Sequence, residues 1–156
     1  MAYWLMKSEP DEVSIDDLQR LGRVPWFGVR NYQARNFMRD GMRVGDRVLF
    51  YHSGCALPGI AGIGEVCSQA YADATQFDTA SPYFDPKATP EQPRWLNVDV
   101  AYVGRGRFVA LAELRRYPEL AAMELLRRGS RLSITPVSEV EWRFITHTLM
   151  ELKHDL

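Results

Sequence analysis

Two β-rich runs in the first half of the chain constrain its fold more than any other feature. They cover Arg47 to His52 and Ile60 to Cys67, and a loop with two glycines and a proline separates them. Runs this close, joined through turn-forming residues, predict antiparallel neighbours in one sheet. A shorter aromatic and apolar run at residues 3–6, which ends before Pro10, predicts a buried strand.

Capping signatures predict where two helices begin. Ser14 is followed after three residues by Asp17, and Ser138 by Glu141, so each pair can satisfy the first free N–H groups of a helix. Apolar residues at three- and four-residue spacings follow both serines. The same spacing between Asn31 and about Asp40 predicts a third helix.

The remainder of the chain predicts short elements and one long irregular segment. Strands are expected at 96–103 and 131–134, and helical pieces at 111–116 and 118–128. Residues 71–94 are polar and rich in proline. We expect this segment to wrap the surface with little regular structure, where it could form the rim of a site.

These elements together predict a mixed α+β fold. We expect a curled, mainly antiparallel sheet of about five or six strands, with inserted and flanking helices, in a single domain over residues 1–156. Strands and helices do not alternate as βαβ units, and the sequence lacks the glycine signatures of dinucleotide and P-loop sites. Neither of those nucleotide-binding folds is therefore expected.

Charge and cysteine content exclude several classes of protein. The formal net charge is −1, so any contact with phosphates must be local rather than spread over the whole surface. Cys55 and Cys67 lack the spacing of a zinc cluster, and neither a metal nor a cofactor is expected. No run approaches the roughly 18 apolar residues of a membrane span, and the first residues lack a secretory pattern. We expect a cytoplasmic monomer without membrane contact.

Aromatic residues beside polar ones form the candidate binding site. Three such groups occur: Trp4 with Lys7, Ser8 and Glu9; Trp26 with Arg30 and Asn31; and Tyr51 with His52 and Ser53. An aromatic face stacks on a nucleobase for about 1–3 kcal/mol, while fixed donors and acceptors read the edge of the base. Two alternatives stay open, namely aromatic residues that only fill the core and a surface ion pair between Lys7 and Glu9.

His52, Ser53 and Glu9 also raise a hydrolase alternative, in which His52 would activate a nucleophile. Adjacent residues on a strand point to opposite faces, and the sequence has no nucleophile-elbow motif. A hydrogen-bonding role for His52 at a pocket wall is therefore favoured.

Arginines cluster near the C-terminal third of the chain, at Arg127, Arg128 and Arg131. Such a patch can contact phosphates even when the total charge is close to zero. Cations near the C-terminus of a helix also interact favourably with its dipole, which explains the cluster without any ligand.

Six long motifs together resemble the EVE domain family. They are YWLMKSEP (3–10), WFGVRNYQARNFMR (26–39), GDRVLFYHS (45–53), GIGEV (62–66), PRWLNVDV (93–100) and RRGSRLSITPVSEVEW (127–142). They occur in the right order over nearly the whole chain, which makes the resemblance far more specific than one short signature. One departure is Phe27, where the family often has Asp.

The resemblance implies a PUA-like β-barrel related to YTH domains, and a non-catalytic reader that holds a modified base in an aromatic pocket. Methylated or hydroxymethylated cytosine in DNA is the favoured ligand. A module for modified tRNA or rRNA, a hydrolase and a small-metabolite site stay as alternatives. The motifs imply ligand-binding roles for Trp4, Lys7, Ser8, Glu9, Trp26, Gly28, Val29, Arg30, Asn31, Tyr51, His52, Ser53, Ser130, Arg131 and Ser133. Phosphate contacts are expected from Arg30, Arg127, Arg128 and Arg131.

Overall fold

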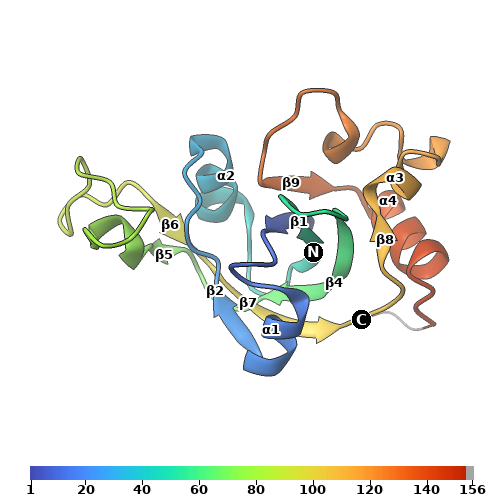
Figure 1. Cartoon of the computed structure of the whole chain (residues 1–156), viewed down its shortest axis with the longest axis horizontal. Helices are drawn as coiled ribbons and strands as arrows, with labels where there is room; N and C mark the ends of the chain where they lie inside the picture. The colour runs from blue at the N-terminus through green and yellow to red at the C-terminus, as the bar shows by residue number, and fades with distance from the viewer. Residues whose placement is uncertain (154–156) are drawn as a thin grey trace.

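A mixed sheet of seven strands forms the centre of the structure (Figure 1). The computed structural model describes residues 1–153, so the last three residues of the predicted 1–156 domain lie outside the described part. Strands pair in the order β2-β7-β4-β3-β1-β9, and β8 pairs with the start of β4. Their bounds are β1 Tyr3–Ser8, β2 Arg23–Pro25, β3 Arg47–His52, β4 Gly59–Val66, β7 Asp99–Gly104, β8 Val109–Ala110 and β9 Ile134–Val137.

The sheet is mainly antiparallel, as predicted. Strands β3 and β4 are antiparallel neighbours, whereas β1 and β3 run parallel. The strand predicted at 96–103 is divided by Val98 into β6 (Leu96–Asn97) and β7, and β6 pairs with β5 (Tyr71–Ala72) in a separate small sheet. The strand predicted at 131–134 begins only at Ile134, and Arg131 and Ser133 before it line a pocket.

The capped helices agree with the prediction. Both capping boxes form, at Ser14 with Asp17 and at Ser138 with Glu141. The predicted third helix begins after Asn31 and continues into a π-helical turn. The helical elements are α1 Ile15–Leu21, α2 Tyr32–Asn36 with its π-turn Phe37–Gly41, α3 Leu111–Leu114, α4 Glu139–Arg143 with its π-turn Phe144–Leu149, and 3₁₀ turns at Ala74–Phe77, Pro118–Leu120 and Glu124–Leu126.

The helical piece predicted at 118–128 is present only in part, because it is not one continuous helix. Two 3₁₀ turns replace it, and they bury Leu120, Met123 and Leu125. Spacings of three and then two residues do not follow one face of an α-helix, which repeats every 3.6 residues. The tighter turns therefore allow all three side chains to reach the same core.

The predicted closure into a barrel was wrong. Within residues 1–153, β2 and β9 form the two ends of the sheet and do not pair with each other (Figure 1). Strand β2 is only three residues long and ends at Pro25, which has no N–H group to donate to another strand. Trp26 still donates its N–H to the Val98 carbonyl at 2.8 Å, and the chain then leaves the sheet. Val24 and Pro25 of β2, and Arg131 and Ser133 before β9, line a pocket.

Two apolar clusters cover opposite faces of the sheet. Met6 and Phe50 belong to one cluster, together with residues of α1 and α2, whereas Leu5 and Leu49 belong to the other, beside α4. Burial on both faces explains why β1 and β3 are continuous apolar runs rather than alternating ones. No helix within residues 1–153 has the length and apolar character required to cross a membrane.

Candidate binding pocket

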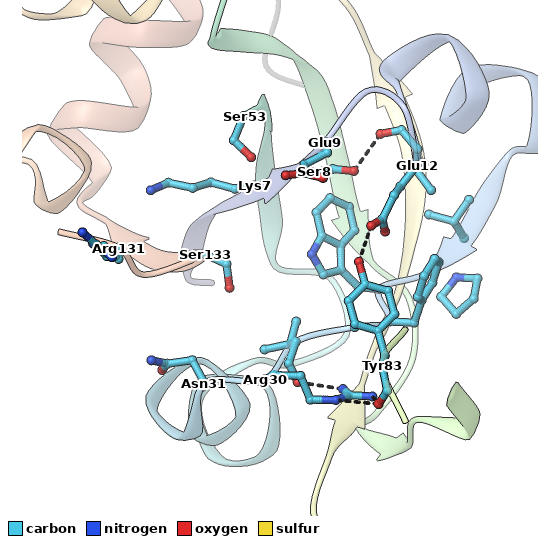
Figure 2. A pocket seen from close by; sticks show the side chains of 17 residues that line it. Lys7, Ser8, Glu9, Glu12, Arg30, Asn31, Ser53, Tyr83, Arg131 and Ser133 are labelled. Atoms are coloured by element: carbon cyan, nitrogen blue, oxygen red, sulfur yellow. Dashed lines mark hydrogen bonds between the residues drawn. The ribbon is translucent and has the colours of Figure 1, made fainter. Parts of the chain in front are cut away.

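A pocket of about 410 Å³ lies where the two edges of the sheet fail to meet. This volume is within the range of small-molecule and cofactor sites. Its walls come from the end of β1, from β2 and the segment after it, from the segment before β9, and from the excursion at 71–94 (Figure 2). The lining residues are Lys7, Ser8, Glu9, Glu12, Val13, Val24, Pro25, Trp26, Phe27, Gly28, Val29, Arg30, Asn31, Ser53, Tyr83, Arg131 and Ser133.

Hydrogen bonds hold the end of β1 to the segment before β9, to Ser53 after β3, and to the turn that leads into α1. The N–H of Lys7 donates to the carbonyl of Ser133 at 2.8 Å, and the N–H of Ser53 donates to the carbonyl of Ser8 at 3.0 Å. The Ser8 hydroxyl donates to the carbonyl of Val13 at 2.7 Å and so closes the turn between β1 and α1. These hydrogen bonds therefore fix the relative positions of the end of β1, the end of β3 and the segment before β9.

Asp73 ties the excursion to the wall that follows β2. Its side chain is fully buried and accepts hydrogen bonds from the Gly28 N–H at 2.8 Å, the Thr75 N–H at 2.8 Å, the Thr75 hydroxyl at 2.6 Å and Arg30 Nη1 at 3.1 Å. Burial raises the pKa of Asp73, but the hydrogen bonds from Thr75, Gly28 and Arg30 outweigh it and hold the pKa below its ordinary value.

Tyr83 brings the excursion to the pocket as a rim. Its ring meets Phe27 edge to face at 5.9 Å between centroids, and its hydroxyl donates to the Glu12 carboxylate (Figure 2). Burial and this hydrogen bond raise the pKa of Tyr83 to about 12, so the hydroxyl remains a donor at neutral pH. The rim predicted for 71–94 is thus present.

The remaining polar groups place the donors of Lys7 and Arg131 on one side of the pocket and the acceptor of Glu9 on the other, together with Tyr83 (Figure 2). Burial lowers the pKa of Lys7, although the Glu124 carboxylate opposes this shift. Within residues 1–153, the Glu9 carboxylate has neither a hydrogen bond nor an ion pair with Lys7, so the surface ion pair that was left open as an alternative does not form.

Two polar residues are already partly committed. Ser8 donates its only hydroxyl proton to Val13, which leaves its oxygen free to accept. Asn31 caps α2, since its Oδ1 accepts from the Ala34 N–H at 3.0 Å, and its Nδ2 group can still donate. A ligand with both donors and acceptors along one edge matches this arrangement.

Eleven of the fifteen predicted ligand-binding residues line the pocket: Lys7, Ser8, Glu9, Trp26, Gly28, Val29, Arg30, Asn31, Ser53, Arg131 and Ser133. Trp4 is instead buried in the core, where its indole N–H donates to Asp46 at 3.0 Å. Tyr51 lies in the cluster on the other face of the sheet, and the Ser130 hydroxyl faces Glu124 at 3.3 Å.

His52 also lies outside the pocket lining. Its Nε2 accepts the Ile15 N–H at 3.1 Å, so this nitrogen is occupied at the start of α1. The hydrogen-bonding role predicted for His52 is present, but at a helix N-terminus rather than at the pocket wall. Because Ser53 lines the pocket and His52 does not, the pair lacks the geometry of a nucleophile and its base.

The predicted phosphate-contacting arginines differ in their surroundings. Arg127, Arg128 and Arg131 are exposed, with Arg127 Nη1 at 3.6 Å from Glu124. Arg30 is different, because all five of its N–H donors are used within the protein. This geometry disagrees with the predicted phosphate contact of Arg30.

Six lining residues were missed by sequence reasoning: Glu12, Val13, Val24, Pro25, Phe27 and Tyr83. A partial signal existed for Phe27, which stands out as a departure within a long motif, and for the excursion that carries Tyr83. No spacing pattern could have paired Tyr83 with Arg30, which is 53 positions away.

The open sheet, with a polar and aromatic pocket between its edges, defines a class of small α+β ligand-binding domain. The family model described as "EVE domain" matches residues 2–148. This chain belongs to the EVE domain family.

Relatives of known structure share both the sequence and the fold. Human thymocyte nuclear protein 1 is 42% identical over 164 residues, covering 92% of this chain and 72% of that protein. Its structure in complex with DNA containing 5-methylcytosine has a TM-score of 0.89 at 41% identity, covering 99% of this chain and 100% of that one. A Pseudomonas syringae protein is 51% identical with a TM-score of 0.90, covering 93% of this chain and 97% of that one.

The resemblance to YTH domains is confirmed at the level of fold. The YTH domain of Zygosaccharomyces rouxii MRB1, solved with N6-methyladenosine RNA, has a TM-score of 0.55 at 12% identity. The match covers 99% of this chain and 87% of that domain.

Proposed function

We propose that this domain is a non-catalytic reader that holds a modified nucleobase, with methylated or hydroxymethylated cytosine in DNA as the favoured ligand. The observation that carries the proposal is the pocket itself, in which Trp26, Phe27 and Tyr83 lie beside polar groups on facing walls. The complex of human thymocyte nuclear protein 1 with 5-methylcytosine DNA supports it, since that protein shares the fold over nearly the full chain.

The proposed mechanism is base flipping without chemistry. Extrusion of a base from the duplex costs a few kcal/mol, and stacking on an aromatic side chain returns about 1–3 kcal/mol per base. Lys7 and Asn31 supply donors for the edge of the base, while Glu9 and the Ser8 oxygen supply acceptors. A ligand acceptor beside Lys7 offsets the desolvation that lowers the pKa of this residue.

We assign the contacts with the phosphates that flank the base to the exposed arginines. Arg131 lines the pocket, and Arg127 and Arg128 precede it on the same segment. A contact with phosphate positions the strand but carries no sequence information. Selectivity for the base is therefore a property of the pocket, and affinity depends on the arginines and on salt.

Tryptophan fluorescence tests the proposal directly. Short DNAs that differ only in one base (cytosine, 5-methylcytosine, 5-hydroxymethylcytosine or N6-methyladenine) are titrated, together with RNA of the same sequence. We expect saturable quenching that is strongest with modified cytosine in DNA. Preference for RNA would favour the RNA-binding alternative, and conversion of the oligonucleotide during incubation would contradict a non-catalytic role.

A pair of variants locates the signal within the protein. Trp26→Phe removes the reporter in the pocket and keeps an aromatic ring, whereas Trp142→Phe removes one in the cluster on the other face of the sheet. Quenching should be largely lost in the first variant and kept in the second. The reverse pattern would show that the ligand binds elsewhere.

A further inference from the structure

The Arg30 guanidinium is saturated by partners inside the protein. Nε and Nη2 both donate to the Tyr83 carbonyl, at 3.1 and 2.7 Å, and Nη2 also donates to the Thr75 hydroxyl at 3.0 Å. Nη1 donates to the Val29 carbonyl at 2.9 Å and to the Asp73 carboxylate at 3.1 Å. A guanidinium has five N–H donors, and these five hydrogen bonds use all of them.

Four of these five hydrogen bonds are accepted by residues of the excursion, and only one is accepted by the adjacent residue Val29. Thr75 and Tyr83 belong to the segment at 71–94, and Arg30 follows β2. The guanidinium carbon also lies over two aromatic rings at cation–π distance, 5.6 Å from the centroid of Tyr83 and 5.4 Å from that of Trp95. Planar stacking and a fixed fork of donors are properties of arginine that lysine does not reproduce.

Tyr83 is the part of the excursion that these contacts bring to the pocket. Its carbonyl is held by Arg30 and its hydroxyl by Glu12, so the residue is fixed at both ends (Figure 2). Its ring lies against Gly28 and lines the pocket. Without Arg30, the Tyr83 carbonyl would lose both of its hydrogen bonds from the guanidinium, and Tyr83 would keep its hydroxyl bond to Glu12 and its ring contact with Phe27.

We infer that Arg30 is a positioning residue: it acts through Tyr83, which it holds as a wall of the binding pocket, and it does not contact a phosphate. This inference rests on the proposed function where it is tested by binding of nucleic acid. It assigns Arg30 and Asp73 to the support of the pocket, and it leaves the contact with the nucleic-acid backbone to the exposed arginines.

A double-mutant cycle tests whether Arg30 acts through Tyr83. Arg30→Lys keeps the charge and loses the fork, and Tyr83→Ala removes the wall. Each should weaken binding of the 5-methylcytosine DNA by about 5- to 150-fold, the fold-change expected for one lost stacking contact. The double variant should lose no more than Tyr83→Ala alone. Additive losses would overturn the inference.

The salt dependence of DNA binding distinguishes a positioning role of Arg30 from a direct contact with phosphate. Removing one phosphate contact reduces the slope of log K against log salt by about 0.9. Arg30→Gln should leave this slope unchanged although affinity falls, whereas the matched control Arg131→Gln should reduce it. A reduced slope for Arg30→Gln would overturn the inference.

A readout without nucleic acid keeps the inference testable on its own. In protein labelled with 3-fluorotyrosine, the ¹⁹F resonance that disappears in Tyr83→Phe belongs to Tyr83. We expect this resonance to shift or broaden in Arg30→Lys and to stay in place in Arg131→Gln, with folding checked by circular dichroism. An unchanged Tyr83 resonance in Arg30→Lys would contradict a positioning role. If the resonance responds but no oligonucleotide binds the wild type, the proposed function fails and the support of Tyr83 by Arg30 stands.

Discussion

Gly28 shows at the scale of one residue how the pocket wall is built. Its φ of 81° lies in the left-handed region, which other residues enter only with strain. A Cβ at this position would lie 2.8 Å from the Tyr83 ring, closer than packed carbon atoms come. The glycine therefore permits both the turn and the approach of Tyr83.

Gly28→Ala should therefore destabilise the protein more than a glycine-to-alanine substitution that introduces backbone strain alone. Gly22→Ala is the matched control, because Gly22 has a φ of 85° and nothing within 4 Å of the added Cβ. We expect the control to cost about 1–2 kcal/mol of unfolding free energy and Gly28→Ala to cost more. Urea denaturation measures both, and equal losses would show that Tyr83 does not pack on Gly28.

At the scale of one element, α1 is held by side chains from two different parts of the chain. The Ser14 hydroxyl accepts from the Asp17 N–H at 3.1 Å, as the sequence predicts. The Ile15 N–H, a second free donor at the helix start, is satisfied by His52 at the end of β3. Helix and sheet are thereby joined by a bond that requires Nε2 of His52 to be unprotonated.

This bond predicts a pH dependence of stability. Burial lowers the pKa of His52, so its contribution is present above the unfolded pKa of about 6.5 and is lost as pH falls through the lower folded value. We expect the unfolding free energy to fall between pH 7 and the acid range. In His52→Gln, whose amide oxygen can accept without titrating, this decrease should be smaller. Identical pH profiles from urea denaturation would contradict the role of His52.

At the scale of the whole molecule, one sheet separates two cores. Leu49 and Phe50 are adjacent in β3 and fully buried, yet they belong to opposite clusters. Because both clusters share β1 and β3, the loss of packing on one face weakens the strands that hold the other. The pocket lies at the open edges, so it does not interrupt either core.

Leu49→Ala and Phe50→Ala should each lower stability without dividing the molecule into two unfolding units. We expect losses of about 2–5 and 3–5 kcal/mol. Urea transitions followed by tryptophan fluorescence and by circular dichroism should coincide in both variants. Separate transitions would mean that the two cores unfold independently.

Local physical chemistry was sufficient for much of the fold. Both capping boxes, the antiparallel pair β3 and β4 and the irregular excursion follow from side chains a few residues apart. Eleven pocket residues were predicted because long motifs cover the end of β1, the segment after β2 and the segment before β9. The sequence by itself therefore determined the capped helices, the central strand pair, the family and most of the pocket lining.

Long-range contacts decided the rest. The sheet stays open because β2 stops at Pro25 and the segment before β9 turns into the pocket. Trp4 and Tyr51 are core residues because both faces of their strands are buried, which no aromatic composition distinguishes from a ligand cage. Arg30 meets Tyr83 across 53 positions of the chain. Only the tertiary structure could show that its donors are used, since a residue's partners depend on which distant segments the fold brings to it.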